Sequence, residues 1–228
     1  MNIDVICYTK TATDHLYRVC RNTLMTLRDS EKDHKFIIHL YENNPNSPYD
    51  FSKMVDRYEV YDEPFAYCKF NNRAYPHVTG DWVMVINNDL RFERGWFSKI
   101  LEVHNKRPDI ESFAPKCPVL YMNNFDYHFV GTDQDYHESY KVTEFVSGWC
   151  ILMKRRVWDA IYPWDERFRF YYTDNDYAER LKELNIKHAL VRDSIVIHLG
   201  SQTTTTVSEA SIWHEEEKMF RTKWNIWH

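Results

Sequence analysis

The chain has 228 residues with a formal net charge of −5 at pH 7, and 43% of its residues are hydrophobic and 28% charged. This composition is typical of one soluble globular domain, and the acidic balance argues against a broad basic surface for nucleic acid, although Lys154, Arg155 and Arg156 form a small basic cluster. The five cysteines are scattered without CxxC spacing, so they predict reduced thiols and neither a disulfide framework nor a zinc site.

The first ten residues, MNIDVICYTK, are too short and too polar a segment for a signal peptide. No apolar run approaches the roughly 20 residues that a membrane-spanning helix needs. We therefore expect a soluble protein that resides in the cytoplasm and has no membrane span.

Strand and helix patterns alternate through the first half of the chain. Short apolar runs rich in β-formers predict strands, and apolar residues at helical spacing predict helices. In chain order we expect a strand at 3–8, then capping residues at 11–14 and a helix that runs to about 27, and then a strand at 36–41. A short helix at 51–58, a strand at 59–61, a short helix at 71–75, a strand at 83–86 and a helix at 93–105 follow. This alternation predicts a mostly parallel α/β sheet.

The second half has a different pattern. It predicts strands at 113–121 and 144–153 around a polar, aromatic loop at 122–140, short helices at 155–161 and 174–184, a strand at 189–198, a Thr-rich link at 201–206 and a last helix at 208–224. Neither GxGxxG nor GxxxxGK[ST] occurs, which excludes the dinucleotide fingerprint and the P-loop.

The apolar run at 83–86 ends abruptly in Asn87, Asn88 and Asp89. Open α/β sheets bind their ligands at the carboxyl ends of parallel strands. An acidic residue at such an end is well placed to hold a divalent cation against a phosphate. The alternative interpretation is that these residues only cap the next helix, because Asn and Asp favour loops.

Two further segments carry candidate functional residues. The aromatic run at 168–172 leads into Asp174 and Asp176 at the start of a predicted helix, where capping and the helix dipole would also favour an aspartate. His198 ends the predicted strand at 189–198, and a lone histidine at a strand end is a weak signal.

In their order and spacing these segments resemble glycosyltransferases of the GT-A fold, in particular the large inverting, sugar-nucleotide-dependent family (family 2 type). The resemblance covers roughly residues 1 to 202, and each motif is weak alone. The motifs are Asn72-Arg-Ala74, Thr79-Gly-Asp81, Val83–Ile86, Asn87-Asn-Asp89, Arg94-Gly-Trp96, Ser147-Gly-Trp149, Lys154-Arg-Arg-Val157, Trp164-Asp-Glu-Arg-Phe168, Thr173-Asp-Asn-Asp-Tyr-Ala-Glu-Arg-Leu181 and His198-Leu-Gly-Ser201.

The resemblance implies a three-layer, Rossmann-like sandwich with a mostly parallel central sheet. Residues 1–110 would form the half that binds the nucleotide sugar, and 111–206 the acceptor-binding and catalytic half of the same domain. Residues 207–228 would add a C-terminal helix.

The resemblance also implies a reaction and the residues for it. The chain would be a glycosyltransferase that takes a sugar from a nucleoside-diphosphate sugar, with a UDP-sugar favoured, and moves it with inversion to an acceptor hydroxyl. Mn²⁺ or Mg²⁺ would be the cofactor. The implied roles are Asp174 as catalytic base; Asp89 and His198 as metal ligands; Gly148, Trp149 and Asp176 on the acceptor side; and Thr9, Lys10, Glu42, Asn72, Arg73, Asn87 and Asn88 on the donor side.

Two departures from the family pattern bear on these roles. The metal motif Asn-Asn-Asp holds one carboxylate where the family has two, so Asp89 must supply most of the metal binding. Thr173 stands where the family has a glutamate before the catalytic aspartate. Simpler interpretations stay open for Arg73 as a surface residue, Trp149 as core packing and Asp176 as a helix cap.

The acceptor and the reaction class also leave alternatives. A saccharide, a lipid-linked glycan, a protein or a modified DNA base would each present a hydroxyl. A carbohydrate-binding relative without catalytic activity is a second alternative. A nucleotidyltransferase is disfavoured because the end of the first strand, Cys7-Tyr-Thr-Lys-Thr11, lacks the glycines of a phosphate loop.

Overall fold

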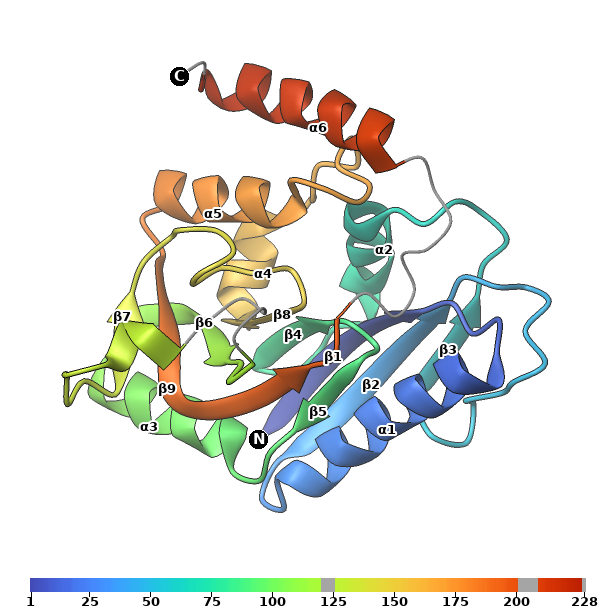
Figure 1. Ribbon diagram of the computed structural model, residues 1–228. Coiled ribbons are helices and arrows are strands. Elements are labelled where there is room, and N and C mark those ends of the chain that lie inside the picture. Colours follow the sequence, from blue (N-terminus) through green and yellow to red (C-terminus); the bar gives the residue numbers. More distant parts are fainter. Residues whose placement is uncertain (120–125, 201–208, 227–228) are drawn as a thin grey trace.

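The computed structural model describes residues 1–119, 126–200 and 209–226, which form a nine-stranded sheet with helices on both faces (Figure 1). The strands are β1 (Asn2–Thr9), β2 (Lys35–Glu42), β3 (Arg57–Val60), β4 (Trp82–Ile86), β5 (Leu90–Phe92), β6 (Ile110–Lys116), β7 (Tyr136–Glu138), β8 (Cys150–Lys154) and β9 (Lys187–His198). The helices are α1 (Asp14–Ser30), α2 (Tyr67–Ala74), α3 (Trp96–Lys106), α4 (Arg155–Ile161), α5 (Thr173–Glu183) and α6 (Glu209–Trp224), with short 3₁₀ helices at Tyr75–His77 and Asp126–Phe129. The predicted link at 201–206 lies outside the described residues.

The strands are ordered β3-β2-β1-β4-β8-β6-β9-β5, and β7 pairs with β9. Strands β1 to β4 pair in parallel, and β8 is antiparallel to both β4 and β6. Strand β9 is parallel to β6, while β5 and β7 are antiparallel to β9. Most strands therefore run in one direction, and the predicted α/β architecture with a mostly parallel sheet is confirmed.

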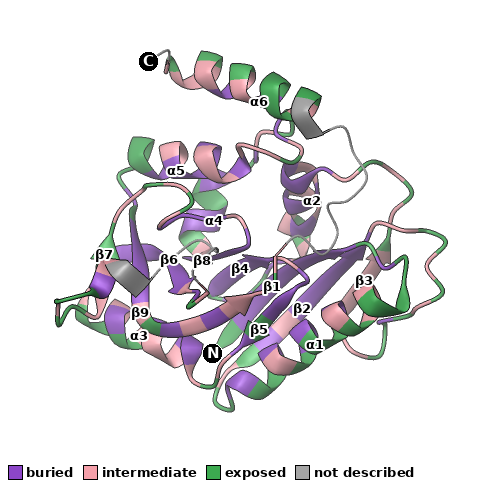
Figure 2. Cartoon of the chain, in the orientation of Figure 1, coloured by how far each residue is buried: buried purple, intermediate pink, exposed green. Residues whose placement is uncertain are grey.

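Helices cover both faces of the sheet (Figure 1). Because side chains alternate along each strand, a central strand such as β1 contributes apolar residues to both of these interfaces. In β1, Ile3, Val5 and Cys7 pack with α1 and α3, whereas Ile6 and Tyr8 pack with α2, α4 and α5. Figure 2 shows the resulting buried sheet between helices whose outer faces are exposed. Helix α6 lies outside α5 (Figure 1). No helix in the described residues is both long and apolar enough to cross a membrane.

A close approach of two chain segments fixes β4 beside β1. The backbone N–H groups of Thr79 and Gly80 both donate to the buried carboxylate of Asp4 in β1. A Cβ atom at Gly80 would lie 2.7 Å from the carbonyl oxygen of Asn2. Only glycine therefore fits here, and the turn holds the amino end of β4 beside the start of β1, where Trp82 pairs with Ile3.

The predicted helix at 51–58 is wrong. The chain turns through 52–56 and enters β3 at Arg57. Asp56 explains the difference, because its carboxylate accepts the Ile38 N–H at 2.9 Å and pairs with Arg28 at 3.0 Å. These contacts with β2 and α1 stabilise a strand that adds to the sheet, and they are not visible in local periodicity.

Two predicted strands are shorter in the structure. The one at 144–153 begins only at Cys150, because residues 141–146 close a tight turn in which Thr143 is left-handed and the Phe145 N–H donates to the Lys141 carbonyl at 2.9 Å. The one at 113–121 corresponds to β6, which begins earlier, at Ile110, and ends at Lys116; residues 120 and 121 lie outside the described ranges.

Candidate active site

The polar residues after β4 lie at the carboxyl edge of the sheet beside the end of β1. The Asn87 N–H donates to the Trp149 carbonyl at 2.9 Å, which ties the end of β4 to the start of β8. The Asn88 side-chain amide donates to the Thr9 hydroxyl at 2.8 Å. The predicted donor residues Thr9, Asn87 and Asn88 therefore come together at one edge.

Asp89 and His198 meet at this edge and form what we call the Asp89–His198 pair. Strand β9 places His198 opposite Leu90 of β5, and Asp89 Oδ1 lies 3.2 Å from His198 Nε2. Asp89 is almost completely buried, and within the described part of the chain its Oδ1 has no hydrogen-bond partner of acceptable geometry. A buried carboxylate oxygen without such a partner is costly and calls for an explanation.

The segment Gly148–Trp149 connects this pair to α5. The Trp149 ring stacks on the His198 ring with centroids 5.3 Å apart and an interplanar angle of 17°. Trp149 is only 3% exposed, which favours bracing of His198 over contact with an acceptor. The Gly148 N–H donates to Asp174 Oδ2 at 3.3 Å.

Asp174 lies in the first turn of α5, half-buried. Its carboxylate also accepts the N–H of Asn175 at 3.0 Å, as expected near a helix N-terminus. Burial raises the pKa of this carboxyl above its ordinary value of 3.8, and the hydrogen bonds from backbone N–H groups oppose the rise only in part. A half-buried carboxylate with a raised pKa is suited to accept a proton.

Asp176 is buried and faces the C-terminal helix. Its Oδ1 accepts the indole N–H of Trp224 at 2.8 Å and pairs with the Lys223 ammonium at 2.7 Å. The predicted acceptor-side role of Asp176 stays a prediction, and these contacts favour a role in docking α6.

We expect Asp176→Ala to lower the free energy of unfolding by about 1–3 kcal/mol, because the half-buried Trp224 N–H loses its acceptor and Lys223 loses one of its two carboxylates. Urea unfolding of the two proteins measures the difference. An unchanged unfolding midpoint together with a tenfold rise in the KM of an acceptor would instead assign Asp176 to the acceptor site.

Glu42, at the end of β2, is completely buried, and burial raises the pKa of its carboxyl. The carboxylate accepts the Thr11 N–H at 3.0 Å and also the Thr11 hydroxyl. It therefore fixes the loop that follows β1, and the predicted donor-binding role of Glu42 stays a prediction. Lys10, on the same loop, is exposed.

Asn72 and Arg73 on α2 have partners away from the Asp89–His198 pair. Asn72 exchanges two hydrogen bonds with the backbone of Trp164, at 2.8 and 2.9 Å. Arg73 pairs with Glu63 and covers the Tyr61 ring at 4.5 Å. Their donor-binding roles stay predictions, and the observed contacts favour structural roles.

Two structural features of this region have no signal in the sequence patterns. Glu216 on α6 is completely buried against the loop that precedes α5. Tyr67 donates its hydroxyl to the Gly148 carbonyl at 3.3 Å. Glu216 stands in the acidic run Glu215–Glu217, which as a local pattern indicates a solvated helix face, and only tertiary structure shows its burial.

The described residues contain no group of three or more His, Cys, Asp or Glu side chains that could hold a metal ion by themselves. A cation at the Asp89–His198 pair would therefore depend on ligands from a bound molecule and from water. Mg²⁺ commonly binds in this way, through one or two protein ligands and substrate phosphates.

No family model matches the chain. Among solved structures, GalNAc-T7 with UDP, GalNAc and Mn²⁺ superposes with a TM-score of 0.66 at 10% identity, over 96% of this chain and 50% of that one. S. aureus TarS 1–349 in complex with UDP-GlcNAc superposes with a TM-score of 0.61 at 12% identity, over 98% of this chain and 66% of that one. The chain has the GT-A glycosyltransferase fold. The fold expected from the motifs is thus confirmed.

One curated protein is related to this GT-A chain by sequence. The O-antigen biosynthesis protein RfbC of Myxococcus xanthus is 24% identical over an alignment 208 positions long, which covers 78% of this chain and 16% of RfbC. The chain therefore spans about a sixth of that relative and between half and two thirds of the two solved structures.

Proposed function

We propose that this protein is a metal-dependent glycosyltransferase that moves a sugar from a UDP-sugar to an acceptor hydroxyl with inversion. The observation that carries the proposal is the Asp89–His198 pair at the carboxyl edge of a GT-A sheet, linked through Gly148 and Trp149 to Asp174. GalNAc-T7 bound to UDP and Mn²⁺ and TarS bound to UDP-GlcNAc support the choice of donor.

The Asp89–His198 pair fits a divalent cation. Two ligands about 2.1 Å from one octahedral ion and at right angles lie about 3 Å apart, close to the 3.2 Å between Asp89 Oδ1 and His198 Nε2. The lack of a well-oriented hydrogen bond to Asp89 Oδ1 is then explained. When bound, Mn²⁺ or Mg²⁺ would act as a Lewis acid for the charge that develops on the diphosphate leaving group.

Asp174 is the proposed general base. As the acceptor oxygen forms its bond to the anomeric carbon, the bond from that carbon to the diphosphate breaks and the electron pair leaves with the nucleotide. The hydroxyl proton passes to the Asp174 carboxylate, which the Gly148 N–H orients. Because the acceptor attacks directly, this displacement inverts the anomeric configuration.

The surface beside Asp174 favours a saccharide acceptor. Phe170 and Trp213 are 41% and 38% exposed on the loop before α5 and on the facing α6, and exposed aromatic rings suit the apolar faces of sugars. The basic cluster gives less support to a DNA acceptor, because Arg155 binds Asp159 and the Val78 carbonyl and Arg156 binds Glu111.

A thermal-shift screen of UDP-, GDP-, CDP- and dTDP-sugars with Mn²⁺ tests the donor. At 100 times its Kd a ligand stabilises the folded protein by about 2.7 kcal/mol, which corresponds to a rise in Tm of about 5–10 °C for a domain of this size. We expect this rise for UDP-sugars, and a larger rise for another nucleotide would reassign the donor. Release of free sugar from the stabilising donor would separate an enzyme from a carbohydrate-binding relative.

A further inference from the structure

A carboxylate from the C-terminal helix holds the loop that leads into α5. Glu216 is 0% exposed, and its two oxygens accept three consecutive backbone N–H groups, those of Arg169 at 3.1 Å, Phe170 at 3.2 Å and Tyr171 at 2.7 Å. Consecutive N–H groups that converge on one anion form a specific concave site. A side chain 45 to 47 residues away in sequence thus fixes this turn.

The turn ends in an unfavourable backbone conformation. Tyr172, the residue before α5, is left-handed, with φ 56° and ψ 8°. Residues other than glycine adopt this region at a cost and keep it only where their surroundings enforce it. Here the Tyr172 ring packs on Phe220 and Trp213 of α6, with centroids 5.3 and 5.9 Å away.

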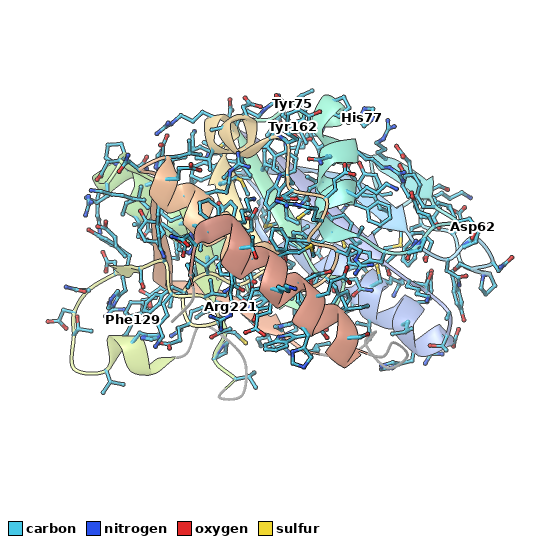
Figure 3. The ribbon with its side chains drawn as sticks, turned by 90° about the horizontal axis from the view of Figure 1, so that it is seen from above. Asp62, Tyr75, His77, Phe129, Tyr162 and Arg221 are labelled. Carbon is cyan, nitrogen blue, oxygen red and sulfur yellow. The ribbon has the colours of Figure 1, made fainter. Side chains whose placement is uncertain are left out.

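Helix α6 also holds the chain after Asp174. Lys223 and Trp224, at its carboxyl end, bind Asp176 in the first turn of α5. Lys223 also reaches Asp165 at 2.9 Å. In Figure 3 the helix that carries Arg221 lies across this side of the molecule. The residues on both sides of Asp174 are therefore fixed by one helix.

We propose that Glu216 is a positioning residue, which holds the backbone at 169–171 in the turn that presents Asp174 to the acceptor. The proposal rests on the proposed function, in which Asp174 is the base. Helix α6 is then part of the framework of the acceptor side. The donor side depends on it less, because Thr9, Asn88 and the Asp89–His198 pair lie on β1, β9 and the end of β4.

Glu216→Gln tests the role with little change of shape. Glutamine keeps one acceptor oxygen, but it loses the charge and turns an NH₂ group toward a backbone N–H. We expect kcat for transfer to fall about 10- to 100-fold, since a displacement near 1 Å is sufficient for such a loss. The Kd of UDP with Mn²⁺ should stay within about twofold of wild type, in contrast to a general loss of structure.

Two variants complete the comparison. Glu217→Gln removes a neighbouring charge that pairs with Arg221 within α6, so kcat should stay within about twofold. Glu216→Asp keeps the charge on a shorter side chain, and its kcat should lie between those of wild type and Glu216→Gln. A folded Glu216→Gln protein with wild-type kcat, or one that loses UDP affinity as steeply as kcat, would overturn the proposal.

Amide hydrogen exchange gives a readout that does not depend on activity. The N–H groups of Phe170 and Tyr171 should be protected in the wild type and should exchange faster in Glu216→Gln, or in Glu216→Asp if glutamine prevents folding. Unprotected amides in an active wild-type protein would overturn the positioning role alone. If the amides were protected but the protein had no transferase activity, the proposed function would fail, and the positioning role of Glu216 would fail with it.

Discussion

Asp174→Asn should lower kcat by about 10²- to 10⁴-fold, the usual contribution of a general base. Asparagine has nearly the same shape and can still accept the Gly148 N–H, which lies 3.3 Å from Oδ2 in the wild type, but it cannot take the proton of the acceptor hydroxyl. The Kd of UDP with Mn²⁺ should stay within a few-fold of wild type, because the role proposed for Asp174 is toward the acceptor and not the donor. Steady-state kinetics and calorimetry measure the two effects.

A second carboxylate on the same helix provides the control. Glu179 pairs with Lys182 within α5, away from the first turn. Glu179→Gln removes the same charge from the helix and should leave kcat within about twofold. If Asp174→Asn retained most of the wild-type turnover, Asp174 would be removed from the role of base.

The raised pKa of Asp174 gives this prediction a pH signature. The base works only when ionised, so the acid limb of kcat/KM should lie above the ordinary pKa of an aspartate. The pH dependence of folding stability runs in the opposite direction to that of activity. Because the folded-state pKa is the higher one, the favourable contribution is present below the unfolded-state pKa and is lost as the pH rises through the folded-state pKa. At neutral pH, Asp174→Asn should therefore be at least as stable as the wild type.

The sequence predicted most where local pattern and tertiary structure agree. The helix at 155–161 coincides with α4, and the polar residues after the 83–86 run do lie at the carboxyl end of a buried parallel strand. Strand β5 was missed because three residues, Leu90–Phe92, are too few to show a period. It pairs with β9 and brings His198 to Asp89.

Roles that depend on a distant partner could not be predicted. The motif assigned the Asn72 side chain to the nucleotide-sugar site, yet its amide binds the backbone of Trp164, 92 residues away. The order of motifs assigned Asp174 and Gly148 to the same half of the domain, and in the structure the Gly148 N–H donates to the Asp174 carboxylate, although their catalytic and acceptor-side roles stay predictions. Neither periodicity nor the family motifs could predict the contact of Glu216 with the loop before α5, because the motifs end near residue 202.

The second large effect concerns the Asp89–His198 pair. We expect Asp89→Ala to make UDP binding independent of Mn²⁺, with a loss of metal affinity greater than the 10- to 100-fold typical of residues that only support a ligand. Calorimetry of UDP with and without Mn²⁺ measures it. Asp81→Ala, at the opposite and exposed end of β4, is the matched control. An equal Mn²⁺ dependence of UDP binding in Asp89→Ala and wild type would contradict the metal site.

The single carboxylate sharpens this expectation. Asp89 is the one anionic member of the Asp89–His198 pair, and Asn87 and Asn88 contribute only neutral amides. A divalent cation that prefers six oxygen-rich ligands should then bind weakly until a diphosphate supplies both charge and oxygens. Wild-type protein titrated with Mn²⁺ alone should show little heat, and the same titration after saturation with UDP should show clear binding. His198→Ala should weaken the second titration less than Asp89→Ala, because a water molecule can replace a neutral imidazole but cannot replace the charge.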